Sequence, residues 1–203
     1  MPTESTKYIS IFPEYPMGVF GYEEIKRYRR KVLHAKIEGE GLIRILNGPS
    51  KILKTVDGHH VNKDFIVGVR DYVCPRSTKS ERARYERRSQ VNLYVSMELV
   101  TLEKISGVVA VKKIAEDVEM CLERALVPAQ RHDFMGVLTD WNTTEKLDAL
   151  IDPGISEVFD QAKLIHSFLA VNKSLIKSFV LVRNMGSEPV ESLLAPPVSA
   201  QER

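Results

Sequence analysis

Residues 91–99 read VNLYVSMEL, and this stretch decides the fold. Apolar side chains alternate along it with polar or partly polar ones: Val91, Leu93, Val95, Met97 and Leu99 against Asn92, Tyr94, Ser96 and Glu98. A period of two is the pattern of a strand in a sheet with one buried face. The sequence therefore predicts a long strand here, and the other elements are placed around it.

A helical pattern follows this strand after a break at Gly107. Apolar residues recur at spacings of three and four: Val111, Ile114, Ala115, Val118, Cys121, Leu122, Ala125 and Leu126. Charged residues occupy most positions between them. This pattern predicts one long amphipathic helix that packs on the sheet and ends near Pro128.

Further strands are expected on both sides of this pair. The runs GLIRIL, KILKTV and DFIVGV between residues 41 and 70 are separated by Asn47-Gly48-Pro49 and Asp57-Gly58, which favour hairpin turns. Phe134–Thr139 and Leu175–Val182 are candidate strands. The run QAKLIHSFLAV at 161–171 is apolar at both alternating sets of positions, which predicts a strand covered on both faces.

Short helices complete the expected fold. Tyr22–Lys36 has the spacing of a surface helix, although 31–37 also fits a strand. Asn142, followed three positions later by Glu145, resembles the capping box of a small helix. We therefore predict an α+β fold, a mostly antiparallel sheet with one long amphipathic helix packed on it plus short helices.

The domain organisation follows from the ends of these patterns. Residues 1–20 mix Pro, Gly and aromatic residues without a period and are interpreted as an N-terminal arm that packs on a neighbour. Residues 21–185 form the single α+β domain, and the proline-containing segment 186–203 is interpreted as a disordered tail. We find no internal repeat and no boundary that divides the chain in two.

Composition limits the possible function classes. The chain has 203 residues, with 29 Lys and Arg against 27 Asp and Glu, so its formal net charge is +2. This balance argues against a generally basic protein that coats nucleic acid. The first 20 residues lack the pattern of a signal peptide, and no run approaches the roughly 20 apolar residues that span a bilayer. We expect no membrane association.

Motifs for catalysis are few. The sequence contains no GxxxxGK[ST], GxGxxG, GxSxG or HExxH pattern, and its five histidines do not stand at zinc-ligand spacings with the cysteines. His59 and His60 are adjacent, and neighbours on a strand point to opposite faces, so they favour a polar turn over a metal site. We predict no catalytic residue, no metal and no cofactor.

Three side chains are the remaining candidates for chemistry. His132 and Asp133 could form a base and its orienting carboxylate, and Cys74 precedes a basic segment where a thiol would be exposed. Cys121 lies on the apolar stripe and is interpreted as a core residue, as His166 is on its apolar strand. Both cysteines are expected to be free thiols.

The segment 76–88, RSTKSERARYERR, is the most basic part of the chain. It contains six cationic and two acidic residues, so its local charge is +4. Clustered guanidinium groups attract phosphates, which makes Arg82, Arg84, Arg87 and Arg88 candidate nucleic-acid-facing residues. The alternative is a solvated loop or frayed helix.

The order of elements over residues 22–182 resembles that of the tail terminator and tail-completion proteins of tailed bacteriophages. The resemblance rests on the strand at 91–99, the helical pattern at 111–126 and the apolar run at 161–171. It implies a non-enzymatic structural subunit that forms a hexameric ring at the end of the tail tube. Its partners would be further copies and the tube, sheath, neck or connector proteins, with the basic loop facing the DNA. The location would be the virion, assembled in the host cytoplasm.

Two other function classes remain open at this point. One is a small cytosolic enzyme that uses His132, Asp133 or Cys74. The other is a nucleic-acid-binding accessory protein, for which affinity should fall steeply with salt.

Overall fold

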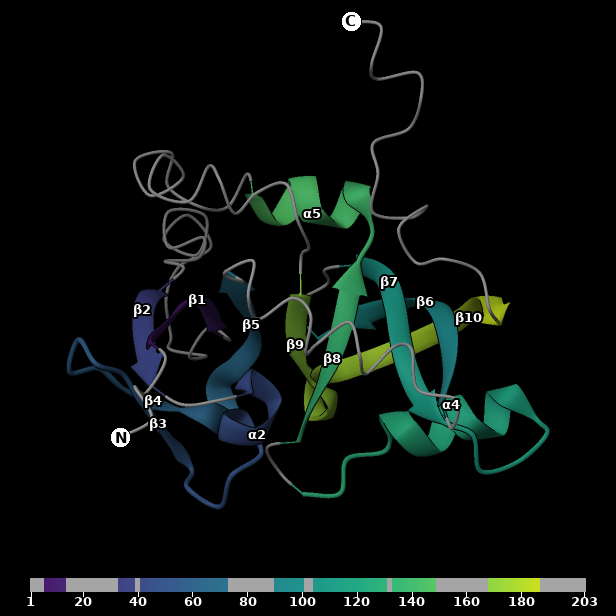
Figure 1. Ribbon diagram of the computed structural model, residues 1–203, viewed down its shortest axis with the longest axis horizontal. Helices are drawn as coiled ribbons and strands as arrows, with labels where there is room; N and C mark the ends of the chain where they lie inside the picture. Colours follow the sequence, from purple (N-terminus) through teal and green to yellow (C-terminus); the bar gives the residue numbers. More distant parts are fainter. Residues whose placement is uncertain are drawn as a thin grey trace, which may run out of the picture.

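An eight-stranded antiparallel sheet forms the body of the molecule (Figure 1). The computed structural model describes residues 6–13, 33–38, 41–72, 90–100, 104–130, 133–148 and 168–186. The strands lie in the spatial order β10 (Ile176–Gly186), β6 (Gln90–Leu99), β7 (Lys104–Lys112), β8 (Phe134–Thr139), β9 (Phe168–Asn172), β5 (Ile66–Tyr72), β1 (Thr6–Pro13) and β2 (Leu33–Glu38). A separate hairpin joins β3 (Ile52–Lys54) to β4 (His60–Asn62).

Two buried clusters cover the two faces of this sheet. On one face, side chains of β6, β7 and β9 pack with the helix α4 (Val118–Leu126). On the other face, β1, β2 and β8 pack with the short helix α2 (Leu42–Leu46) and with Leu53 of the hairpin. Burying one large aliphatic side chain contributes about 1.5–3 kcal/mol to the free energy of unfolding, so each cluster contributes to the stability of the sheet.

Several predicted strands are confirmed. β6 contains the whole alternating stretch 91–99, and its five apolar positions face the cluster around α4. The predicted strands at 134–139 and 175–182 correspond to β8 and β10. All five residues of β9 are buried, as expected for a strand covered on both faces, while 161–167 lie outside the described residues. Gly58, with a φ of 85°, makes the turn of the β3–β4 hairpin.

The prediction of one long amphipathic helix is wrong. Val111 belongs to β7, and α4 spans only the nine residues Val118–Leu126. Asp117 fixes the start of α4, because its Oδ1 accepts the N–H groups of Glu119 at 2.9 Å and Met120 at 3.4 Å. The apolar end of β7 and Ile114 extend the helical spacing by coincidence, so the stripe in the sequence runs across two elements.

Gly107 was expected to mark the break between the strand at 91–99 and the following helix, but it lies inside β7. A Cβ at this position would clash with the carbonyl oxygen of Leu138 and stand 2.8 Å from the Cα of Thr139. Glycine is therefore required for β8 to approach β7 this closely.

Three other local predictions are corrected. The run GLIRIL forms the helix α2 rather than a strand, with Leu42 and Leu46 one turn apart and both buried. In the predicted helix 22–36, residues 33–36 belong to β2, and 22–32 lie outside the described residues. The small helix α5 (Trp141–Asp148) is capped by Asp140, whose Oδ1 accepts the N–H of Thr143 at 2.8 Å, so Asn142 is not its cap.

Residues 6–13, assigned from the sequence to an arm, form β1 inside the sheet between β2 and β5. Ile9 and Ile11 are buried in the chain's own core. Their alternation is too short to be recognised as a strand beside Pro13 and Pro16. Residues 14–20 and the predicted tail from 187 onward lie outside the described residues.

The chain folds as two topologically equivalent halves, a repeat that the sequence analysis missed. Among the described elements, each half contains strand, strand, helix, strand, strand, 3-10 helix, strand, from β1 to β5 and from β6 to β10, and the second half adds α5 between its third and fourth strands. The first and second strands pair in each half, as do the first and fifth and the third and fourth. The recognisable sequence match is confined to VNKDFI at 61–66 and VNKSLI at 171–176, which is too short to stand out.

Candidate interaction surface

The β10 strand lies at one edge of the eight-stranded sheet and pairs on one side only, with β6, among the strands that the structure describes. Phe179 and Leu181 point inward and pack against the core around α4. Val180 and Val182 alternate with them and are 63% and 54% exposed. An edge strand with exposed valines presents both backbone hydrogen-bonding groups and apolar surface, which is the usual template for pairing with another chain.

Contacts with Glu98 fix the start of this edge strand on β6. The carboxylate of Glu98 accepts from the Lys177 ammonium at 3.0 Å and from the Ser178 hydroxyl at 3.3 Å. The hydrogen bond from Lys177 lowers the pKa of Glu98. The edge is thus held in register on its inner side, while the two valines remain exposed.

A second exposed apolar region surrounds the β3–β4 hairpin. Ile52, Val56 and Phe65 are exposed there, and Phe65, at 49%, belongs to the 3-10 helix η1 (Lys63–Phe65) that follows β4. β4 pairs only with β3 among the described strands. The hairpin therefore offers a second, shorter sheet edge.

A lysine side chain anchors each of the two 3-10 helices, and the first of these lysines is buried. Lys63 is 1% exposed, and its Nζ donates to the carbonyl oxygens of Ile45 at 2.9 Å and Gly48 at 3.2 Å, at the end of α2. Burial lowers the pKa of Lys63. These contacts hold the C-terminal end of α2, where the Ile45 carbonyl also accepts the N–H of Gly48 at 3.3 Å, and they favour a structural role for the ammonium group.

Lys173 does the same in η2 (Lys173–Leu175). Its Nζ donates to the carbonyl oxygens of Ala125 at 3.1 Å and Val127 at 3.3 Å, at the end of α4. It also forms a 2.6 Å ion pair with Asp133. Asp133 Oδ2 additionally accepts the N–H of Ala129 at 2.7 Å.

A polar cluster connects α5 to the sheet. The Tyr94 hydroxyl donates to Asp140 Oδ2 at 2.6 Å, and Ser106 contacts both Ser96 and Thr143. Burial, followed by the hydrogen bond and the charge of Asp140, raises the pKa of Tyr94 to about 12. The protonated Tyr94 hydroxyl donates to one oxygen of Asp140, and the other oxygen caps α5, so Asp140 connects α5 to β6.

Of the three candidates for chemistry, His132, Asp133 and Cys74, the structure describes only Asp133. Asp133 is committed to Lys173 and Ala129, and His132 lies outside the described residues. His59 and His60 lie at the exposed end of the hairpin. Within the described ranges, no group of three or more His, Cys, Asp or Glu side chains is arranged to hold a metal ion.

Other predicted site residues divide into two groups. Cys121 is confirmed as a buried free thiol in the core. The nucleic-acid-facing candidates Arg82, Arg84, Arg87 and Arg88 lie outside the described residues, as do Cys74 and His166. Their predicted roles stay predictions.

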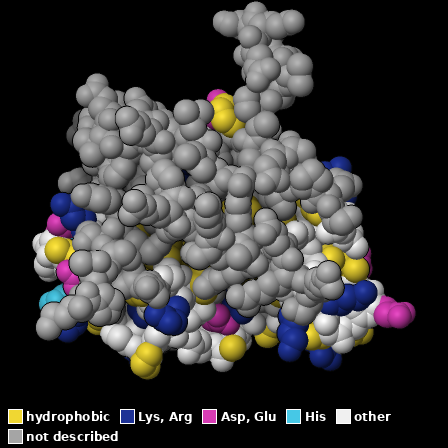
Figure 2. All heavy atoms as spheres, in the orientation of Figure 1, with side chains coloured by type: hydrophobic (Ala, Val, Ile, Leu, Met, Phe, Trp, Pro, Cys, Tyr) yellow, Lys and Arg dark blue, Asp and Glu magenta, His cyan; other side chains and the backbone are white. Residues whose placement is uncertain are grey.

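Figure 2 shows how charge is distributed on one face of the molecule. On the coloured, described part of this face, Lys and Arg side chains stand in separate groups along the lower rim, with acidic and hydrophobic side chains between them. This distribution does not form a continuous cationic track over the visible described surface.

The β10 edge was not predicted from the sequence. Its signal is the apolar run Phe179–Val182, in which both alternating sets are apolar although the strand lies at an edge. Edge position depends on long-range pairing, so it is visible only once the sheet order is known.

No protein-family model, curated protein or solved structure matches this chain. Among the described helices, none has the length and apolar character needed to cross a membrane.

Proposed function

We propose that this protein is a structural subunit that associates with further copies of itself through the β10 edge. The observation that carries the proposal is the pair Val180 and Val182, exposed on a strand with an unpaired side among the described strands. Pairing at this edge would bury both valines and satisfy the outward backbone groups together.

The polar groups described above support an assembly role over catalysis. Asp133, Lys173 and Lys63 are engaged in capping helix ends, and Tyr94 and Asp140 hold α5. Each is accounted for by a structural contact. We therefore propose that the protein is not an enzyme and that its partners are proteins.

We further propose the neck or tail of a phage virion as the setting, with neighbouring neck or tail proteins as partners. This part rests on the resemblance in element order: the strands β6, β8, β9 and β10 stand in the expected sequence positions, whereas the expected helix at 111–126 is divided between β7, a loop and α4. A homo-oligomeric ring is the form that this setting requires.

The self-association is tested by light scattering behind a sizing column over a range of protein concentrations. We expect the wild type to form a discrete oligomer. The variant Val180→Lys/Val182→Lys should be monomeric, because lysine on an edge strand opposes pairing. Val127→Lys is the control for placing a lysine at an exposed valine, since Val127 is 64% exposed and follows α4 rather than lying on β10.

The control should retain the oligomer of the wild type, and all three proteins should unfold at similar denaturant concentrations. A wild type that is monomeric at every concentration would overturn the proposal. So would a lysine double variant that stays folded and oligomeric.

A further inference from the structure

The repeat extends to the hydrogen bonds of the two 3-10 helices. Asn62 Oδ1 accepts the N–H of Asp64 at 3.0 Å, and Asn172 Oδ1 accepts that of Ser174 at 3.1 Å. The lysine that follows each asparagine caps a helix of its own half, Lys63 the helix α2 and Lys173 the helix α4. Its own N–H donates to the residue before the third strand, to Lys51 in the first half and to Asp133 in the second.

Strand registers repeat with the same spacing. Ile11 of β1 pairs with Val69 of β5, and Met97 of β6 pairs with Phe179 of β10. The separation along the chain from Val69 to Phe179 equals the separation between the asparagines that cap the two 3-10 helices. The local motif thus sets the equivalence of β5 and β10, and the sheet registers are compatible with it when Ile11 is matched to Met97.

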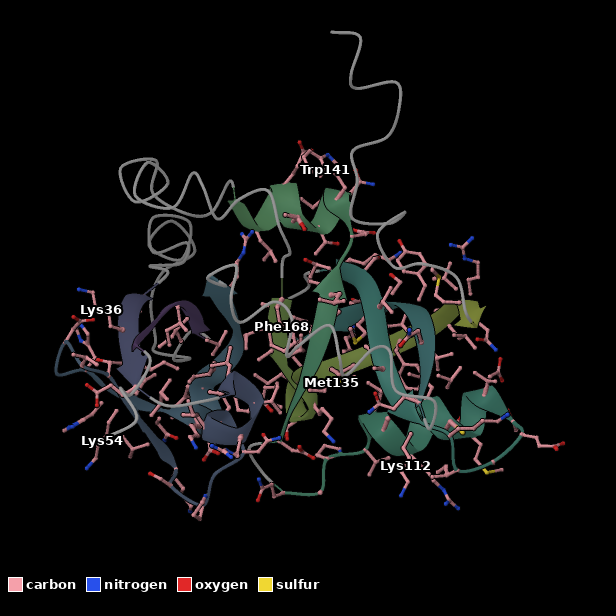
Figure 3. The ribbon with its side chains drawn as sticks, in the orientation of Figure 1. Lys36, Lys54, Lys112, Met135, Trp141 and Phe168 are labelled. Carbon is pink, nitrogen blue, oxygen red and sulfur yellow. The ribbon has the colours of Figure 1, made fainter. Side chains whose placement is uncertain are left out.

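The contact between the second and third strands is also repeated. In the second half, β7 pairs with β8, with Val108 opposite Leu138. In the first half, the N–H of Val56 donates to the carbonyl oxygen of Lys36 at 2.7 Å, so the hairpin meets β2 at the equivalent position. Figure 3 shows Lys36 and Lys54 at the same end of the molecule, where this contact lies.

The strand pair that joins the halves has no equivalent within the described part of the chain. β9, the fourth strand of the second half, pairs with β5, the fifth strand of the first half. With the halves exchanged, the equivalent pair would be β4, the fourth strand of the first half, and β10, the fifth strand of the second half. Figure 1 shows β4 and β10 at opposite sides of the molecule, so they do not meet within one chain.

Resting on the proposed self-association, we propose that β10 of one copy pairs antiparallel with β4 of a second copy. The β5–β9 pair supplies the register, because Ala170 stands opposite Val69 and Leu169 opposite Arg70. By the spacing that separates Asn62 from Asn172, Ala170 and Leu169 correspond to His60 and His59, and Val69 and Arg70 correspond to Phe179 and Val180. The transferred register therefore places His60 opposite Phe179 and His59 opposite Val180 of the other copy.

Exposed apolar side chains support this choice of occupant. Val180 and Val182 are exposed on β10, while Val56 and Phe65 are exposed beside β4. Two unlike edges that each carry apolar surface are complementary to each other in a second copy of the chain. Such a contact is heterologous, so repetition gives a closed ring or an open filament.

Disulfide trapping tests the register. One protein carries His59→Cys and the other Val180→Cys, both in a Cys74→Ser background, with Cys121 kept because it is buried. After mixing and mild oxidation, we expect a covalent heterodimer. Paired residues on adjacent antiparallel strands have Cβ atoms about 4.5–5.5 Å apart, and a small adjustment brings them into disulfide range.

The matched control mixes His59→Cys with Val182→Cys, which is also exposed but two positions out of register. Diagonal neighbours stand about 7–8 Å apart, so crosslinking should be at least ~10-fold slower. Equal rates for the two mixtures, or no crosslink in an oligomeric sample, would overturn the β4–β10 pairing.

The two proposals fail in distinguishable ways. In one outcome, Val180→Lys/Val182→Lys abolishes the oligomer but the cysteine pair forms no crosslink. This outcome would support the β10 edge as an interface and exclude β4 as its partner. A monomeric wild type removes both proposals.

Discussion

Lys63 and Lys173 occupy equivalent positions and make the same contact in the two halves of the protein. Each ammonium donates to two backbone carbonyl oxygens at the end of a helix, at 2.9 and 3.2 Å for Lys63 at α2 and at 3.1 and 3.3 Å for Lys173 at α4. Only Lys173 adds a carboxylate partner, Asp133. The shared geometry identifies a repeated structural unit, and the difference between the two lysines makes their contributions to stability unequal.

The first prediction compares the loss of stability when each of these lysines is replaced. Lys63→Met removes hydrogen bonds from a charged donor, and we expect a loss of about 2 kcal/mol in the free energy of unfolding. Lys173→Met also leaves the buried carboxylate of Asp133 without its cation, so we expect a loss of about 3–5 kcal/mol. Urea unfolding followed by circular dichroism measures both.

The matched control is Lys54→Met, because Lys54 is exposed on the hairpin. It should change the free energy of unfolding by less than about 0.5 kcal/mol. Adding Asp133→Asn to Lys173→Met should recover part of the loss, since the amide oxygen can still accept from Ala129. Equal losses for the two single lysine variants would contradict this account.

A second prediction concerns alkaline pH and Tyr94. The pKa of Tyr94 is raised from 10 to about 12, so between these values the unfolded chain releases a proton that the folded protein retains. The stability contributed by Tyr94 is thus complete below pH 10 and is lost as the pH rises toward and through 12. Tyr94→Phe should lose less stability than the wild type over pH 10–12 in denaturant unfolding.

At pH 7 the same substitution removes the hydrogen bond to Asp140, and we expect a loss of about 1–2 kcal/mol. Asp140→Asn should cost a similar amount, because it weakens the cap of α5 as well. Because the two residues share this hydrogen bond, the double variant should lose less than the sum of the two single losses, and strictly additive losses would contradict the contact.

Much of the sheet could be predicted from the sequence, because alternation is a local signal. The strand at 91–99 is specified by its own side chains, and the run at 168–171 by its lack of polar positions. The apolar stripe predicted a helix that is too long, because Val111 and Ile114 continue the spacing of α4 into a strand and a loop. Only the cap at Asp117 marks the true boundary.

The candidate interaction surface could not be predicted in this way. The exposure of Val180 and Val182 depends on β10 lying at the edge, which is decided by pairing with β6, a strand from much earlier in the chain. The repeat depends on registers between distant strands. The sequence carries little of either relationship beyond the short match between 61–66 and 171–176.

The third prediction concerns the basic segment 76–88. If Arg84 and Arg87 contact phosphates, Arg84→Glu/Arg87→Glu should weaken binding to duplex DNA and flatten its salt dependence, with unfolding unchanged. Lys112→Glu/Lys113→Glu, at exposed positions at the end of β7 and just after it, is a control of equal charge change. Equal binding by both double variants would show that the basic segment makes no specific contribution.

The fourth prediction rests on a difference between the two halves at Gly107, where β7 and β8 approach each other closely. In the first half the equivalent position is occupied by Ala35, which pairs with Ile9 as Gly107 pairs with Val95. There the second and third strands meet through the backbone hydrogen bond described above, whereas in the second half β8 lies directly against the Gly107 backbone. The first half therefore has room for a methyl group at this position, and the second half does not.

A methyl group at Gly107 would force β8 away, so Gly107→Ala should cost about 1–3 kcal/mol in urea unfolding. Gly48→Ala is the control, because the nearest atom to its Cβ would be the Ile45 carbonyl oxygen at 3.3 Å, which needs a much smaller adjustment. A Gly107→Ala variant as stable as Gly48→Ala would mean that β7 and β8 are not packed this tightly.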